Sequence, residues 1–201
     1  MKKFKKLFLS FLFFSFCVAF SFAQINTVKK DMSDCPVGIF VNGKIIPPLK
    51  YSKIKAGKGA WLSGLTYGAA KASNYLEFKG ATSFTRVAVG DTIIFKFGDV
   101  PAKYLSEMWE FDASKTPNSF GIGKFKAKSD KRELKTASVS IWTGVDMGTK
   151  ETSDVKLDLV KQEGTDYIFV VSEAKPGEYC IMFNENASGG YLPVFDFTVR
   201  K

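Results

Sequence analysis

Residues 155–183 read VKLDLVKQEGTDYIFVVSEAKPGEYCIMF and contain three strand signals in succession. Residues 155–160 alternate apolar and charged side chains, which is typical of a strand with one buried face. A Gly-Thr-Asp turn then leads into the apolar run 167–171, and a Pro-Gly turn leads into 178–183. Short β-branched and aromatic runs bounded by Gly, Asp and Pro favour strands over helices. The stretch therefore predicts three consecutive β-strands.

The same pattern extends outward over most of the chain. Further runs of this kind are found at 75–78, 84–89, 92–97, 107–112, 123–128, 133–141 and 194–199. Near the start, Asn42-Gly43 separates two apolar runs, and this dipeptide favours a type I′ hairpin turn because both central residues need a positive φ. With little helical periodicity, the pattern predicts an all-β fold: a β-sandwich, Ig-like or jelly-roll-like, with a candidate division into two small sub-domains near 114–122.

The N-terminus has the pattern of a secretory signal peptide. Four lysines precede an apolar run over residues 7–22, and the run ends in Ser21-Phe22-Ala23, with small residues at −3 and −1. We expect residues 1–23 to be removed, 24–34 to be a flexible leader and 35–201 to be the β-sandwich domain. An uncleaved anchor remains the alternative for the first segment; after cleavage no transmembrane span is expected. The predicted location is the periplasm, the cell surface or the extracellular space.

Removal of the signal changes the charge of the chain. Four of the 29 Lys and Arg and none of the 20 Asp and Glu would be lost, so the net charge falls from +9 to +5. A modest positive charge favours anionic surfaces such as envelope lipids or acidic glycans. Only three of the basic residues are arginines, whose planar forks suit phosphate and base recognition. We therefore expect no nucleic-acid partner.

Two cysteines remain in the predicted mature chain, Cys35 and Cys180. In an exported protein a pair of cysteines favours a disulfide, which would join the start of the domain to a strand near its end. Two buried thiols are the alternative.

The sequence lacks most of the residues that enzymes use. It has no histidine, which argues against Ser-His-Asp hydrolysis, Cys-His proteases and His-ligated zinc. It also lacks a phosphate-binding glycine loop and EF-hand spacing. We predict no catalytic, cofactor-binding or metal-binding residues. The alternative is a carbohydrate-active enzyme with paired carboxylates, for which Glu107, Glu110 and Asp112 beside Trp109 form the densest acidic cluster.

Two features suggest binding. Aromatic side chains on a β-sandwich can stack on sugar rings, although aromatics at strand spacing are usually core; the candidates are Trp61, Trp109 and Trp142. The second feature is a stripe of cations that alternates with Phe125 and Ala127, so that one strand face would carry it. Its members are Lys124, Lys126, Lys128, Lys131, Arg132 and Lys135. The stripe is either a docking site for an anionic polymer or a solvated edge strand that resists aggregation.

The chain from Phe125 to its end resembles a group of exported bacterial β-sandwich proteins without assigned function. The resemblance lies in Arg132-Glu133, in the turn Pro176-Gly177-Glu178-Tyr179 and in the closing Phe195-Asp196-Phe197 strand. It implies a β-sandwich and brings no catalytic residues. The C-terminal strands also loosely resemble the sorting domains of some exported bacterial proteins, which leaves a secretion or anchoring module as another alternative.

Taken together, these features predict an exported, non-catalytic binding or structural module. Its expected partner is an anionic envelope component, a glycan or another protein. The fold analogy itself does not specify a function.

Overall fold

The computed structural model describes residues 31–56, 72–140, 144–147, 151–183 and 194–200. The predicted signal peptide and most of the leader lie outside these ranges, as do Trp61 and Trp142. Within the described ranges, no helix is long and apolar enough to cross a bilayer.

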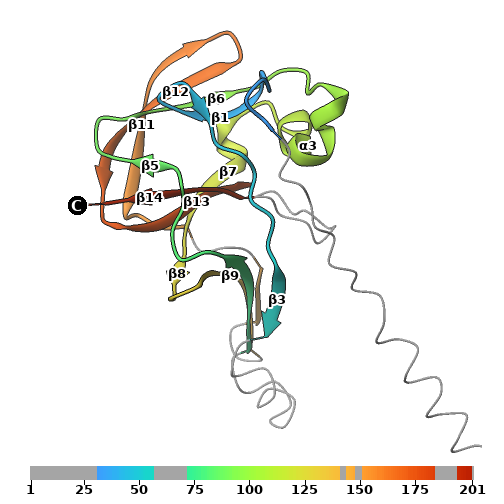
Figure 1. Cartoon of the computed structure of the whole chain (residues 1–201), viewed down its shortest axis with the longest axis vertical. Helices are drawn as coiled ribbons and strands as arrows, with labels where there is room; N and C mark the ends of the chain where they lie inside the picture. The colour runs from blue at the N-terminus through green and yellow to red at the C-terminus, as the bar shows by residue number, and fades with distance from the viewer. Residues whose placement is uncertain (1–30, 57–71, 141–143, 148–150, 184–193, 201) are drawn as a thin grey trace, which may run out of the picture. The chain divides into compact units, whose positions relative to one another are not determined.

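Most of the described chain is arranged in three β-sheets (Figure 1). Sheet I has the order β11 (Val155–Glu163), β12 (Asp166–Ala174), β6 (Thr92–Lys96), β1 (Gly38–Val41) and β2 (Lys44–Ile45). Sheet II has the order β5 (Arg86–Val87), β14 (Val194–Val199), β13 (Gly177–Phe183) and β7 (Phe120–Lys124). Sheet III has the order β10 (Gly144–Met147), β9 (Lys131–Ser140), β4 (Ala72–Lys79) and β3 (Lys53–Ala56), and β8 (Lys126–Ala127) also pairs with β9. Among the described residues, all strand pairs are antiparallel except β14 with β5. The all-β prediction is confirmed.

Sheet II is the middle layer, because both of its faces pack against other sheets. On β13 and β14, Tyr179, Ile181 and Phe197 point to one face and join a core cluster with Ile93 and Phe95 of sheet I. Side chains that alternate with them point to the opposite face and join a second cluster with sheet III. That cluster contains Cys180, Met182, Val194, Leu76, Phe78, Leu134 and Phe125. Figure 1 shows the same order, with β13 and β14 between β6 and β9.

The segment 107–112 is helical, so the strand predicted there is wrong. Helix α3 spans Leu105–Ala113 and follows a short 3₁₀ turn, η1, at Ala102–Tyr104. Tyr104, Met108 and Phe111 are buried in the core between sheets I and II. Their spacing of four and three residues is that of one helix face, and this burial favours the helix over a strand.

The candidate sub-domain boundary near 114–122 connects α3 to β7 through a second 3₁₀ turn, η2, at Pro117–Ser119. Phe120 lies directly after this turn. Its ring is 5.6 Å from that of Phe95 and 5.0 Å from that of Phe111, measured between centroids. Residues Met32–Lys201 form one compact unit that includes this connection.

The hairpin predicted at Asn42-Gly43 is confirmed. Val41 pairs with Lys44 and Phe40 with Ile45, and the two turn residues have φ values of 49° and 80°. These positive values are those that a type I′ turn requires.

The predicted disulfide between Cys35 and Cys180 is wrong in this structure. Cys180 is a free cysteine, and it is fully buried between sheets II and III. Cys35 lies in the other cluster, where its thiol donates to the carbonyl of Val37 at 3.3 Å. The middle sheet separates the two clusters, and burial raises the pKa of the Cys180 thiol.

Candidate ligand-binding face

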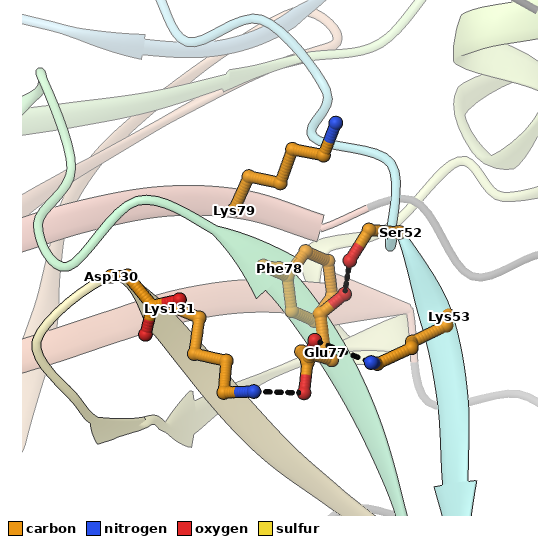
Figure 2. Close-up of a pocket in the computed structure, with 7 residues that line it drawn as sticks. All are labelled: Ser52, Lys53, Glu77, Phe78, Lys79, Asp130 and Lys131. Carbon is orange, nitrogen blue, oxygen red and sulfur yellow. Dashed lines mark hydrogen bonds and ion pairs between the residues drawn. The ribbon is translucent and has the colours of Figure 1, made fainter. Parts of the chain in front are cut away.

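An open pocket of about 290 Å³ lies on the outer face of sheet III (Figure 2). Its lining residues are Ser52, Lys53, Glu77, Phe78, Lys79, Asp130 and Lys131. In Figure 2, Lys53 and Lys131 approach the carboxylate of Glu77 from two sides, whereas Lys79 extends away from it. Ser52 donates its hydroxyl to the backbone carbonyl of Glu77 at 2.8 Å, which fixes the start of β3 against β4.

The register of sheet III explains why the charged side chains share this face. Lys53 is opposite Glu77, Glu77 is opposite Glu133, and Lys79 is opposite Lys131. Directly opposed residues of antiparallel strands point to the same side of a sheet. The alternating residues of β4 and β9, including Leu76, Phe78 and Leu134, point inward to the second cluster.

Two buried glutamates on this face each hold two lysines. The carboxylate of Glu77 lies 3.3 Å from the ammonium of Lys53 and 2.8 Å from that of Lys131. That of Glu133 lies 2.5 Å from Lys128 and 3.3 Å from Lys55. Hydrogen bonds from these lysines, chiefly Lys131 and Lys128, lower the pKa of each carboxyl despite its burial. Each group of two lysines and one glutamate keeps one net positive charge, with its ammonium groups positioned by a buried anion.

Among the side chains that the structure describes, the outer face of sheet III carries an excess of positive charge, and we call it the basic face. Register and ion pairs place seven lysines on it: Lys53, Lys55, Lys79, Lys126, Lys128, Lys131 and Lys135. Three carboxylates accompany them, those of Glu77, Glu133 and Asp130. Seven lysines against three carboxylates leave a net charge of +4.

The predicted six-residue stripe is therefore only partly formed. Lys126, Lys128, Lys131 and Lys135 lie on the basic face. Lys124 belongs to β7 of sheet II and pairs with Asp154 at 2.5 Å. The chain leaves sheet II at Phe125, which is buried, and this break between β7 and β8 ends the predicted alternation.

Arg132 also lies outside the predicted stripe, because its side chain points to the interior. Only 2% of the residue is exposed, and its guanidinium lies 2.6 Å from Asp196 and 3.5 Å from Glu178. Its Nε donates to the carbonyl of Gly80 at 3.1 Å, and the guanidinium sits over the ring of Phe125.

The carboxylate of Glu178 has further partners in this polar cluster. The hydroxyl of Thr198 donates to it at 2.7 Å, and the backbone N–H of Ser83 donates to it at 2.8 Å. Arg132, the turn glutamate Glu178 and the aspartate of the Phe-Asp-Phe strand, Asp196, thus meet between sheets II and III. The geometry gives these motif residues a structural role.

The candidate catalytic carboxylates lie on α3 and point in different directions. Glu110 is completely buried, and neither carboxylate oxygen has a hydrogen-bond partner among the described residues. Burial raises the pKa of Glu110 to about 8. Glu107 is half-buried and Asp112 is exposed, so the three do not line a common cleft. Trp109, the described member of the three tryptophans, packs edge-on against Phe183 with centroids 5.7 Å apart.

Lys53, Lys55 and Lys79 lie on the basic face but were not predicted as binding residues, although their spacing in the sequence was a weak signal. Lys53 and Lys55 flank Ile54, and Lys79 follows Glu77 by two positions, so each pair has strand spacing. Which strands become neighbours could not be predicted from this spacing.

No family model, curated protein or solved structure matches the chain. In the part of the chain that the structure describes, no group of three or more His, Cys, Asp or Glu side chains is arranged to hold a metal ion.

Proposed function

We propose that this protein is a non-catalytic binding module that docks through the basic face of sheet III onto an anionic polymer or membrane surface of the cell envelope. The observation that carries the proposal is the excess of seven lysines over three carboxylates on one sheet face. The pocket between Lys53, Lys79 and Lys131 provides a recess within this face for a single anionic group.

The geometry supports electrostatic rather than shape-specific recognition. Neighbouring strands are about 4.8 Å apart, so the lysines form a two-dimensional array of ammonium groups. Glu77 and Glu133 hold four of these lysines in place, while the others are available to a ligand. Lysines act as hydrated point charges, so the attraction is expected to weaken as salt screens it.

The test uses three lysines that form no ion pair with another described residue. Lys79→Gln, Lys126→Gln and Lys135→Gln are combined in one variant, which leaves both glutamate-centred groups intact. The matched control combines Lys44→Gln, Arg86→Gln and Lys115→Gln, which removes the same charge away from sheet III and breaks no ion pair with another described residue. The probes are vesicles containing phosphatidylglycerol and, separately, polygalacturonate, each at low and physiological salt.

We expect the basic-face variant to lose about tenfold or more in affinity for at least one probe, because each lysine near an anionic surface contributes about 1 kcal/mol. The control should lose much less. Equal losses in the two variants would show that net charge alone drives binding, and binding by neither parent nor variant would refute the proposal.

We also propose that the protein is exported and that its mature form begins at Gln24. The support is the lysine-rich start, the apolar run and the Ser21-Phe22-Ala23 site in the sequence. Intact mass of the protein recovered outside the cytoplasm measures this directly. A mass that includes residues 1–23 would contradict cleavage.

A further inference from the structure

Strand β11 forms an open edge of sheet I. Its only strand partner in the described chain is β12, so its other backbone edge has no partner strand there. After Val155, which is buried, the strand is largely exposed. Leu159 is 53% exposed and Val160 is 59% exposed, and together they form an apolar centre on this edge. Unpaired edges with apolar side chains are ready templates for another strand.

A β-bulge at the centre of β11 determines which side chains share a face. Leu159 is opposite Phe169 and Lys161 is opposite Ile168, so Val160 is the extra residue. Leu157, Leu159 and Gln162 therefore point toward the core side of sheet I. The charged residues Lys156, Asp158, Lys161 and Glu163 point to the outer side.

With Val160 left out of the ladder, β11 is complementary to itself. We propose that β11 pairs antiparallel with β11 of a second copy of this chain, about a twofold axis at Leu159. In this register Asp158 is opposite Lys161 of the partner subunit, and Lys156 is opposite Glu163 of the partner subunit. The facing residues lie on the same side of the joined sheet, as antiparallel pairing requires. By symmetry each pair occurs twice, and sheet I continues from one copy into the other.

The neighbouring registers are disfavoured by charge. An axis at Asp158 would place Asp158 against itself and Lys156 against the partner's Lys161. An axis at Lys161 would place Lys161 against itself and Asp158 against the partner's Glu163. Like charges directly opposite on adjacent strands are destabilising. Axes nearer either end of β11 overlap fewer residues, so the register at Leu159 combines complementary charge with the longest overlap.

The ion pairs that these residues make within one chain do not prevent this pairing. Lys156 lies 3.7 Å from Glu173, and Lys161 pairs with Glu163 on the same strand. Both pairs are largely exposed, and such pairs contribute little stability. Asp158 forms no ion pair with another described residue and is available to a partner lysine.

The first test is a charge swap measured by sedimentation velocity over a concentration series of the mature chain. Asp158→Lys alone and Lys161→Asp alone should each weaken dimerisation at least tenfold, because each places like charges opposite one another. The double variant D158K/K161D restores both pairs and should dimerise within about threefold of the parent. Lys44→Asp, at the β1–β2 turn, is the control and should have no effect.

The second test fixes the register. Leu159→Cys brings two thiols opposite each other at the axis, where the Cα separation of about 4.5 to 5.5 Å suits a disulfide. Mild oxidation should cross-link this variant rapidly, whereas Gln162→Cys, which faces the partner's Leu157, should not cross-link. A parent that stays monomeric, a double variant that fails to recover, or equal cross-linking of both cysteine variants would each overturn the proposal.

Discussion

Glu110 is completely buried, and this burial disfavours the ionised form of its carboxyl group. It lies on α3 among Met108, Phe111 and other apolar side chains, and neither carboxylate oxygen has a hydrogen-bond partner among the described residues. Burying an ionised carboxyl without a partner is costly, and the usual response is protonation. The raised pKa of Glu110, about 8, reflects this desolvation. At neutral pH the folded protein therefore favours a protonated Glu110, whereas the unfolded chain favours an ionised one.

We predict that Glu110→Gln stabilises the protein in a pH-dependent way. The folded-state pKa is raised from 4.5 to about 8, so the folded state binds a proton that the unfolded state releases. Stability is therefore highest below about pH 4.5 and declines as pH rises toward about 8. The neutral amide removes this loss. Its advantage should be small at pH 5 and reach on the order of 3 to 5 kcal/mol at pH 8.5.

Urea denaturation at pH 5, 7 and 8.5 measures this effect. Glu107→Gln, one turn earlier on the same helix and half-buried, is the control and should change stability little at any pH. A pH-independent effect of Glu110→Gln would show that the carboxyl is ionised in the folded protein or paired there.

At the scale of elements, the sequence predicted the strands that carry turn signals at both ends. The runs at 155–160, 167–171, 178–183 and 194–199 correspond to β11, β12, β13 and β14. The same reasoning failed for α3, because Glu107 to Asp112 also mixes polar and apolar residues over a short distance. The spacing of Tyr104, Met108 and Phe111 was the available helical signal, and only packing in the core between sheets I and II makes it decisive.

The residues of the basic face could likewise be predicted only in part from the sequence. Alternation along 124–128 correctly placed Lys126 on an exposed face, but the turn inward at Phe125 moved Lys124 to another sheet. Arg132 alternates with Lys131 and therefore points to the opposite side of β9. The remaining lysines of the face come from β3 and β4, which pair with β9 only in the folded protein.

The β1–β2 hairpin allows a prediction for a single element. Gly43 has a φ of 80°, and nothing in the described structure lies within 4 Å of the position that a Cβ would take. Gly43→Ala should therefore cost about 1 to 2 kcal/mol through backbone strain alone. Gly43→Asn is the matched control and should cost less, because asparagine tolerates this conformation. Thermal unfolding of both variants provides the comparison, and equal losses would argue against the type I′ turn.

At the scale of the whole molecule, sheet II lies in the middle and forms one interface with sheet I and a different one with sheet III. The interface with sheet I is apolar and aromatic, with contacts such as Phe95 of β6 to Phe120 of β7 at 5.6 Å between centroids. The interface with sheet III combines apolar residues with the cluster of Arg132, Glu178 and Asp196. The sequence could predict each strand of this arrangement. It could not predict a third layer, because that depends on which face of β13 and β14 each sheet covers.

The final prediction concerns the interface between sheets II and III. Arg132→Met removes the cation that faces the carboxylates of Glu178 and Asp196, at 3.5 and 2.6 Å. An uncompensated buried charge costs about 3 to 5 kcal/mol, so we expect a loss of this size in the free energy of unfolding. Arg86→Met, an exposed arginine on β5, is the control and should change stability by less than about 0.5 kcal/mol.

A rescue variant separates lost charge compensation from lost packing. Adding Glu178→Gln and Asp196→Asn to Arg132→Met leaves no net charge in the cluster and should recover part of the lost stability, because an apolar or neutral replacement of a buried ion cluster is often tolerated. Hydrogen exchange locates the effect: in Arg132→Met the amides of β4 and β9 should lose protection more than those of β1 and β6, which lie in sheet I. If all four strands lose protection equally, or if Arg132→Met costs no more than Arg86→Met, then this cluster does not hold sheet III to the middle layer.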